Sequence, residues 1–339
     1  MSRLAIVSDV HGNLTALEAV IEDLRRRRVD RVMHAGDLAF AGAQPAEVVD
    51  RIRELGWPGI VGNTDEMLWR PELQAEQEAR APKLRAMLSV FFEEYAPATA
   101  ERLGDERIAW LRELPVERRL DDVVLVHASP GDLWRAPMAD APDDELAAVY
   151  GGAGAPVAVY GHVHVPFVRP VGALTVANSG AVGSPFDGDP RTSYLLVEDG
   201  VPSVIRVPYD LDREAAALRA SGYPDAERIV ETRRLGRFVW GRERGACGLP
   251  ASGRVNSGDE RGWPRARRGR GSGVFDLCWN YSYKGRTPPR VRRAGWTQPL
   301  LWAQFTRSEA QSAQGRAPRA PASHHHVHPK PAERKPSAR

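Results

Sequence analysis

The side chains best suited to chemistry in this sequence are aspartate, asparagine and histidine residues that fall in five short motifs. The motifs are D-V-H-G-N at 9–13, G-D at 36–37, G-N-T-D at 62–65, H-A-S at 127–129 and G-H-V-H at 161–164. Carboxylate and amide oxygens and imidazole nitrogens are all common metal ligands. The chain has two cysteines, Cys247 and Cys278, which excludes a cluster of several thiolate ligands. We therefore expect a metal site built from oxygen and nitrogen ligands.

The number of these side chains favours two metal ions over one. The candidate ligands are Asp9, His11, Asp37, Asn63, His127, His162 and His164. This mixture of oxygen and imidazole ligands suits Mn, Fe, Zn, Ni or Co better than Mg or Ca. Two such ions about 3.5 to 4 Å apart, sharing one carboxylate, would hold a bridging hydroxide and clamp a phosphoryl group for in-line attack. The sequence therefore predicts two divalent metal ions and a phosphate-ester substrate.

Other histidines are interpreted differently. His34 lies inside a predicted strand, so we interpret it as a packing residue. The histidines at 324–326 and 328 could bind metal adventitiously, but no structural pattern surrounds them.

The elements that must position the motifs alternate between strands and helices. Predicted strands cover 4–8, 32–35, 59–61, 123–127, 157–162, 174–178, 193–199 and 201–210, and predicted helices cover 14–24, 45–55, 72–114 and 212–220. Asn13 is the expected N-cap of the first helix. Because the motifs follow or end predicted strands, and ligands bind at the carboxyl ends of strands in α/β sheets, the motifs should converge on one crevice. The pattern predicts an α/β fold whose later strands add antiparallel pairs.

The composition divides the chain into two parts. Residues 240–339 contain 20 Lys and Arg against 6 Asp and Glu, whereas the preceding residues contain 27 basic and 38 acidic side chains. Apolar periodicity is also lost past about residue 238. We expect a catalytic domain at 1–238 and a basic, low-complexity tail at 239–339 that is disordered or is no evolved module. The alternatives are a basic interaction segment and a small folded module.

The chain contains 42% hydrophobic residues but no apolar run long enough to cross a bilayer. The first residues lack the apolar core and cleavage site of a secretory signal. We therefore expect a cytoplasmic protein without membrane contact. The sequence does not indicate an oligomeric state.

The ordered set of motifs resembles the calcineurin-like metallophosphoesterase superfamily, and most closely its small bacterial and archaeal phosphodiesterase branch. The resemblance covers residues 1 to about 235. It implies a four-layer α/β/β/α sandwich of two mixed β-sheets flanked by helices. It also implies that one metal ion is bound by Asp9, His11, Asp37 and His164, and the other by Asp37, Asn63, His127 and His162. Asp37 would then bridge the two ions.

One position departs from the superfamily pattern. The motif is commonly G-N-H-D, and Thr64 stands here in place of the histidine. A threonine hydroxyl cannot act as a general acid at neutral pH, and Asp65 would lack the imidazole that it usually orients. The departure disfavours monoesters with poor leaving groups. We expect Asp37, Asn63, Thr64 and Asp65 to be the catalytic residues.

The leading hypothesis is therefore a dinuclear metal-dependent phosphoesterase that acts on phosphodiesters more readily than on phosphomonoesters. Trp134 and Arg135, in the loop after the predicted strand 123–127, are candidate substrate-binding residues. One alternative is a binding scaffold of the same fold without turnover. Another is a nucleic-acid-binding protein that uses the basic tail, which we favour less than a solvated tail.

Overall fold

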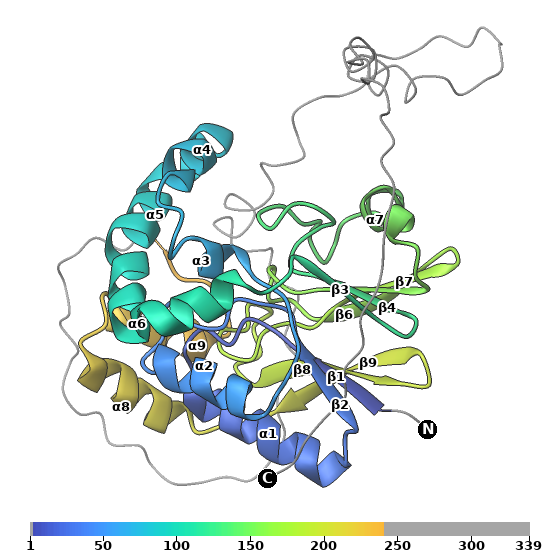
Figure 1. Ribbon diagram of the computed structural model, residues 1–339, viewed down its shortest axis with the longest axis horizontal. Coiled ribbons are helices and arrows are strands. Elements are labelled where there is room, and N and C mark those ends of the chain that lie inside the picture. The colour runs from blue at the N-terminus through green and yellow to red at the C-terminus, as the bar shows by residue number, and fades with distance from the viewer. Residues whose placement is uncertain (1–2, 241–339) are drawn as a thin grey trace, which may run out of the picture. The chain divides into compact units, whose positions relative to one another are not determined.

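Two β-sheets pack face to face within residues 3–240, the part of the chain that this computed structural model describes (Figure 1). The strand order of the first sheet is β2 (Arg31–His34), β1 (Arg3–Val7), β8 (Thr192–Glu198) and β9 (Val201–Val207). That of the second sheet is β3 (Glu117–Leu120), β4 (Val123–Val126), β5 (Val157–Tyr160), β7 (Leu174–Asn178) and β6 (Phe167–Val171). Each sheet combines parallel with antiparallel pairs. The predicted pair of mixed sheets is confirmed.

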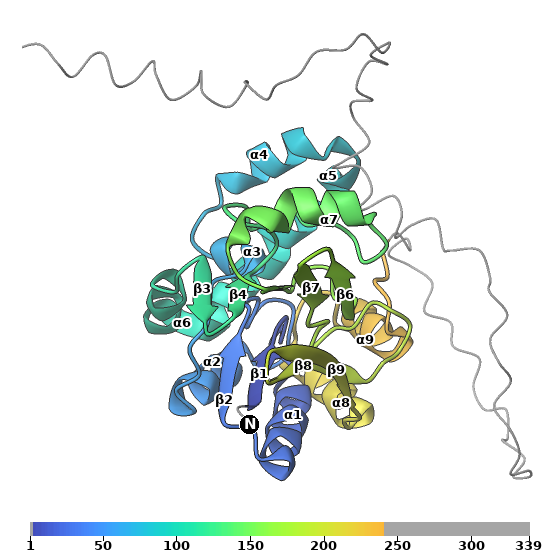
Figure 2. The same cartoon turned by 90° about the vertical axis from the view of Figure 1, so that its right-hand side faces the viewer.

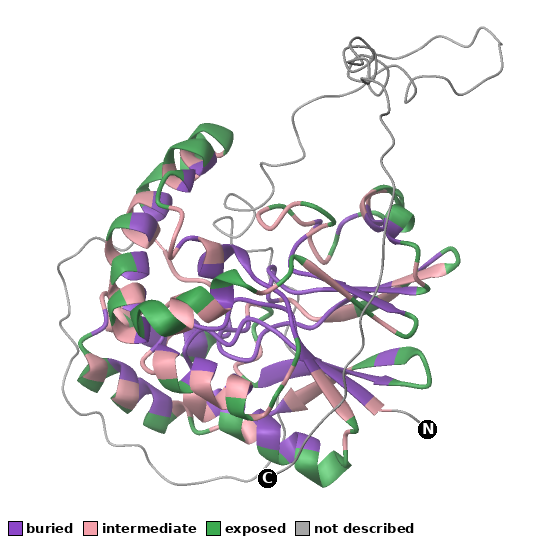
Figure 3. Cartoon of the chain, in the orientation of Figure 1, coloured by how far each residue is buried: buried purple, intermediate pink, exposed green. Residues whose placement is uncertain are grey.

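Alternation of side chains along β1 places this strand between two hydrophobic clusters. Ile6 points towards the second sheet and packs with Leu125 and Val159. Val7 points the other way and belongs to the cluster that contains Leu17 of the first helix. Successive side chains of a strand face opposite sides, so β1 is covered on both faces, as Figure 3 shows for the central strands.

Helices cover the outer faces of the sheets. On the side of the first sheet lie α1 (Leu14–Arg27), α2 (Pro45–Glu54) and α8 (Leu211–Ser221). The outer face of the second sheet is covered by α7 (Asp143–Tyr150), whose Leu146 and Tyr150 pack with Val124 and Ala158. The order helix, sheet, sheet, helix is visible in Figure 2 and confirms the four-layer sandwich.

The region 72–114 is helical as predicted, but it is broken into several pieces. The pieces are α4 (Leu73–Arg80), a 3-10 turn (Pro82–Leu84), α5 (Arg85–Val90), a π-helical turn (Phe91–Tyr95) and α6 (Ala96–Arg112). Gly104 interrupts α6 with φ of 71° and ψ of 164°. These breaks let the segment bend over the carboxyl ends of the strands (Figure 1).

Several elements differ from the sequence-based expectation. The predicted strand 59–61 is reduced to a single bridge between Gly59 and His34. A Cβ atom at position 59 would lie 2.2 Å from the ring of His34, so this short segment packs closely beneath that ring. The elements α7, β3, β6 and α9 (Ala226–Leu235) had no clear apolar period and were not predicted. β6 contains Pro170, which an edge strand tolerates because it forms hydrogen bonds on one side only.

The start of α1 agrees with the sequence. The side chain of Asn13 accepts a hydrogen bond from the amide of Ala16 at 2.9 Å, as an N-cap residue should. No helix within residues 3–240 is long and apolar enough to cross a membrane. The predicted tail, including its proposed nucleic-acid contacts and the histidines at 324–328, lies outside the described residues apart from its first two positions. The boundary at residue 238 stays a prediction.

Candidate metal centre

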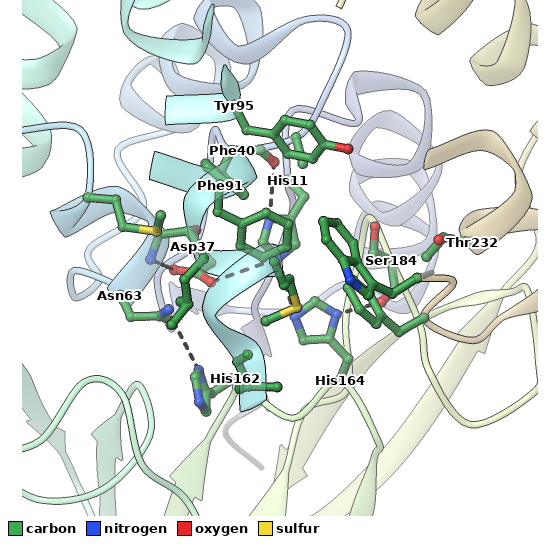
Figure 4. Close-up of a pocket in the computed structure, with 18 of the residues that line it drawn as sticks. His11, Asp37, Phe40, Asn63, Phe91, Tyr95, His162, His164, Ser184 and Thr232 are labelled. Atoms are coloured by element: carbon green, nitrogen blue, oxygen red, sulfur yellow. Dashed lines mark hydrogen bonds and ion pairs between the residues drawn. The ribbon is translucent and has the colours of Figure 1, made fainter. Parts of the chain in front are cut away.

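The side chains that follow the strand ends meet at one buried point between the two sheets. Asp9 and His11 follow β1, Asp37 follows β2, and His127 follows β4. The remaining candidate ligands are His162 and His164 after β5, and Asn63 at the first position of the short helix α3 (Asn63–Glu66). All seven side chains are buried, and Figure 4 shows several of them facing one cavity. The predicted convergence of the motifs on one place is confirmed by these positions.

One group of ligand atoms gathers around Asp9. Nε2 of His164 lies 3.1 Å from Oδ1 of Asp9, and Nε2 of His11 lies 3.8 Å from the same oxygen. The two Nε2 atoms are 3.2 Å apart. Oδ1 of Asp9 makes no hydrogen bond within the described part of the chain. These three atoms lie close enough together to bind a single cation.

A second group gathers around Asn63. Its side-chain oxygen lies 2.8 Å from Nε2 of His127 and 2.9 Å from Nδ1 of His162. Asp37 lies between the two groups: its Oδ1 is 3.5 Å from Nε2 of His127, and its Oδ2 is 3.8 Å from Nε2 of His11. Asp37 can therefore contribute one oxygen to each group.

Hydrogen bonds behind the rings fix which nitrogen faces the centre. Nδ1 of His11 lies 3.1 Å from the carbonyl oxygen of Phe40, and Nδ1 of His127 lies 2.7 Å from that of Ala35. Nδ1 of His164 donates in the same way to the carbonyl of Ser184 at 2.6 Å. A carbonyl oxygen can only accept, so Nδ1 carries the proton in each ring and Nε2 presents a lone pair. This is the arrangement that metal-ligating histidines adopt.

These lone pairs need a positive charge between them. With both rings neutral, Nε2 of His11 and Nε2 of His164 would face each other at 3.2 Å as two acceptors. Burial alone would lower the pKa of His164, but the carboxylate of Asp9 raises it above the usual value. Burial and the neighbouring His164 lower the pKa of His11 to about 4. One proton therefore satisfies the pair, and a divalent cation bound between these atoms would take its place. The residues present thus fit the metal ions that the sequence predicts.

Asp65 has a different place from the ligands. Its carboxylate accepts hydrogen bonds from the backbone amides of Asp37 at 2.8 Å, Leu38 at 3.0 Å and Gly62 at 3.1 Å. Burial raises the pKa of Asp65 to about 7, and the nearby Asp37 carboxylate contributes to the shift. Asp65 does not line the cavity, whereas Thr64 does. The hydrogen bonds of Asp65 hold the loop that carries Asp37.

Thr64, the one departure from the common motif, is buried at the edge of the centre. Its backbone amide donates to Oδ1 of Asp37 at 3.0 Å. Its hydroxyl oxygen has no hydrogen-bond partner among residues 3–240. Thr64 lines the cavity, and its enclosed hydroxyl is not bonded to the surrounding described residues.

Two further features support the centre from behind. The segment after β7 runs behind the centre: the amides of Val182 and Gly183 donate to the carbonyls of Ser8 and Asp9, each at 2.9 Å. Arg233 of α9 is 1% exposed and donates to the carbonyl of His11 at 2.8 Å. A charged residue in a polar helix carries no signal of burial, so only the tertiary structure could show this contact.

Arg233 is held in place by a buried ion pair with Glu214 of α8. The same guanidinium donates to the carbonyl of Ala41 at 3.1 Å. The pair thereby connects the last two helices to the loop that carries His11. Both candidate substrate-binding residues line the cavity: Trp134 is half-buried and Arg135 is exposed.

Comparison with known proteins agrees with this fold. The model of the calcineurin-like phosphoesterase superfamily domain matches residues 2–199, and the chain belongs to this superfamily. The resemblance inferred from the five motifs is thereby confirmed.

Three of the similar proteins come from archaea and bacteria. An uncharacterized protein of Methanocaldococcus jannaschii is 29% identical over 252 residues, which cover 66% of this chain and 95% of the relative. A metallophosphoesterase from Sphaerobacter thermophilus has 27% identity and a TM-score of 0.56, covering 69% of this chain and 99% of that one. A hypothetical protein from Pyrococcus horikoshii has 19% identity and a TM-score of 0.58, covering 70% and 100%, and at this identity it supports the fold alone.

Proposed function

We propose that this protein is a dinuclear metal-dependent phosphoesterase that hydrolyses phosphodiesters in preference to phosphomonoesters. The observation that carries the proposal is the buried cluster in which lone pairs of histidine, carboxylate and amide groups face one another. Such a cluster is costly to maintain without a positive charge from a proton or a cation, because buried acceptors face one another. Membership of the superfamily supports phosphate esters as the substrate class.

In this proposal, Asp9, His11 and His164 bind one ion, and Asn63, His127 and His162 bind the other. Asp37 is shared, as the directions of its two oxygens favour. Two divalent ions bound here would lower the pKa of a coordinated water and offset negative charge that develops on the phosphoryl oxygens. Mn, Fe, Zn, Ni and Co are the candidate ions.

The chain's own residues would keep these ligands in position. The carbonyls of Phe40, Ala35 and Ser184 orient three of the rings. The carboxylate of Asp65 fixes the loop of Asp37 through backbone amides. We assign Asp65 as a positioning residue on this basis, because its carboxylate is directed at the loop and away from the cavity.

The preference for diesters rests on Thr64. A leaving alkoxide of high pKa requires a proton from a general acid, and the hydroxyl of Thr64 cannot supply one at neutral pH. Its buried hydroxyl can instead donate a hydrogen bond to an ester oxygen. Trp134 and Arg135 at the cavity wall are the proposed contacts for the rest of the substrate.

The test uses the full chain supplied separately with Mn, Fe, Zn, Ni or Co. We expect hydrolysis of bis(p-nitrophenyl) phosphate at a higher kcat/KM than p-nitrophenyl phosphate, with about two bound ions per chain by elemental analysis. Two bound ions without hydrolysis of either ester would favour a binding scaffold over an enzyme. Failure to bind any of these ions would refute the proposal.

A further inference from the structure

A cavity of about 180 Å³ opens directly beside the candidate metal centre (Figure 4). Asp37 and His164 contribute to it from the centre. Other walls come from the broken helical segment α4–α6 and from residues 228–240. The last of these walls lies beyond residues 2–199, which match the superfamily model. The contacts that the cavity offers are thus partly outside the shared family domain.

A continuous aromatic wall runs from the centre outwards. The ring of Phe186 stacks on His164, with centroids 4.2 Å apart and planes at 13°. Phe238 follows at 5.6 Å from Phe186, then Phe91 at 6.4 Å from Phe238, and Trp240 at 6.1 Å from Phe91. All of these rings line the cavity. An ester group attached to a phosphorus at the metal centre would therefore contact the aromatic rings of this wall directly.

Phe91 begins the π-helical turn Phe91–Tyr95, and both of these residues line the cavity. Figure 4 shows the ring of Phe91 in the middle of the drawn side chains. A π-turn inside a helix is uncommon and is often found at functional sites. Here the turn presents Phe91 and Tyr95 to the same cavity.

One polar side chain in this aromatic cavity lacks a partner. Gln77 of α4 is 7% exposed and lines the cavity. Its side-chain amide makes no hydrogen bond with any residue in the range 3–240, in contrast to Gln74 on the same helix, whose amide donates to Glu78 at 3.1 Å and Glu93 at 2.7 Å. The amide atoms of Gln77 are not among the fully enclosed unpaired atoms of the described residues, so the amide is open to the cavity. It is available to a ligand that brings hydrogen-bonding atoms into the cavity.

We propose that this cavity binds one ester arm of the substrate, and that the arm carries a planar aromatic ring with hydrogen-bonding atoms on its edge, as a nucleobase does. The ring would stack within the aromatic wall, and its polar edge would pair with the amide of Gln77. This inference rests on the proposed phosphodiesterase function, because the metal centre is what places the phosphorus beside the wall.

The size and charge of the cavity agree with such an arm. A cavity of roughly 150 Å³ accommodates benzene, so about 180 Å³ accommodates one small ring system. An alkyl chain would fill the space but would leave Gln77 unpaired. Arginine side chains that suit an anionic ester also line the cavity, namely Arg80, Arg135 and Arg228.

The experiment compares three diesters that share a p-nitrophenolate leaving group on the full, metal-loaded chain. Their second arms are methyl, phenyl and thymidine 5′-yl. Stacking of a base on aromatic side chains corresponds to a gain in affinity of roughly 5- to 150-fold. We expect kcat/KM for the phenyl ester to exceed that for the methyl ester by a factor in this range, and the thymidine ester to be better still.

Two variants separate the ring from its polar edge. Phe91→Leu should lower kcat/KM for both aromatic esters relative to the methyl ester. Gln77→Leu should lower the ratio of the thymidine to the phenyl ester by about 3- to 10-fold, the usual range for one hydrogen bond. Gln74→Leu, on the same helix but bonded elsewhere, is the matched control and should leave the ratio unchanged. Urea unfolding of each variant shows whether it is folded.

The outcomes distinguish this inference from the proposed function. Hydrolysis of all three esters at rates within about twofold would overturn the inference and leave the function standing. If the aromatic esters are preferred but Gln77→Leu does not alter the ratio of the thymidine to the phenyl ester, the proposed pairing of Gln77 with a polar edge is wrong. If no ester is hydrolysed, the proposed function fails, and calorimetry still tests recognition of the ring: thymidine 5′-monophosphate should bind more tightly than methyl phosphate, and equal affinity would overturn the inference.

Discussion

His34 should make the stability of this protein depend on pH in a way that one substitution removes. The ring is fully buried, and neither ring nitrogen has a hydrogen-bond partner in the described part of the chain. It packs against Gly59 and lies 6.2 Å from the ring of Trp110. Burial lowers the pKa of His34 to about 3, and the nearby guanidinium of Arg118 adds to this effect. The folded state therefore holds His34 neutral.

The size of the effect follows from the difference in pKa between the two states. An unfolded histidine has a pKa of about 6.5, so below this pH the unfolded state binds a proton that the folded state excludes. Stability must then fall as pH falls, by up to about 1.4 kcal/mol per pH unit, until the folded pKa is reached. At pH 5 the loss from this one residue is about 2 kcal/mol.

The assay is urea unfolding of the full chain and of His34→Leu, both free of metal, at pH 7.5 and pH 5. Other titrating groups are common to both proteins, so the difference between their free energies of unfolding isolates position 34. We expect the leucine variant to gain about 2 kcal/mol relative to the native chain when the pH is lowered from 7.5 to 5. If the two proteins lose stability in parallel, the ring is hydrated or hydrogen-bonded, and the assignment of His34 as a buried neutral residue is wrong.

Three further predictions test the site. Asp37→Asn should reduce the content of both metal ions in elemental analysis because a neutral amide bridges two cations poorly, whereas Asp9→Asn should deplete mainly one ion. Two tightly bound ions in the Asp37 variant would contradict the role of Asp37 as a shared ligand. Thr64→His should accelerate hydrolysis of alkyl phosphates more than hydrolysis of nitrophenyl phosphates, since general acid catalysis typically raises a rate by about 100- to 10,000-fold. An equal change for both substrates would show that position 64 acts through geometry. Arg233→Met should lower the free energy of urea unfolding by about 3 to 5 kcal/mol because it leaves Glu214 buried and unpaired. The double variant with Glu214→Leu should recover most of that stability but not the metal affinity, because the hydrogen bond to the carbonyl of His11 is still missing.

The fold could be predicted where a strand or helix shows a clear period of apolar residues and has capping or turn residues at its ends. The strand β1, the N-cap Asn13 and the helix beginning at Pro45 are of this kind. The elements that were missed depend on distant partners. The polar sequence of α9 is buried through Ile229 and Val230 against a cluster contributed by other helices, and no period in α9 itself shows this contact.

The candidate site was predictable for a related reason. Six of its seven ligands follow the strands β1, β2, β4 and β5, and the sheet topology brings the carboxyl ends of these strands together whatever lies between them in sequence. The aromatic wall could not be predicted, because Phe91, Phe186 and Trp240 come from a π-turn, a loop and the last described residue, which share no sequence pattern.

Backbone strain gives an independent reason to regard these residues as functional. Asp9, His11, Asp37, His162 and His164 all have positive φ, between 49° and 63°. This left-handed region is uncommon for residues other than glycine, although Asn, Asp and His adopt it more often than the rest. Each such residue costs on the order of 1 kcal/mol or more, and glycine would relieve that cost but remove the ligand atom. A fold under selection for stability alone would have no reason to retain this strain. The concentration of this strain in five of the seven candidate ligands therefore indicates that their side chains are needed where they are. Metal binding would explain that need, because the lone pairs of these side chains face one another.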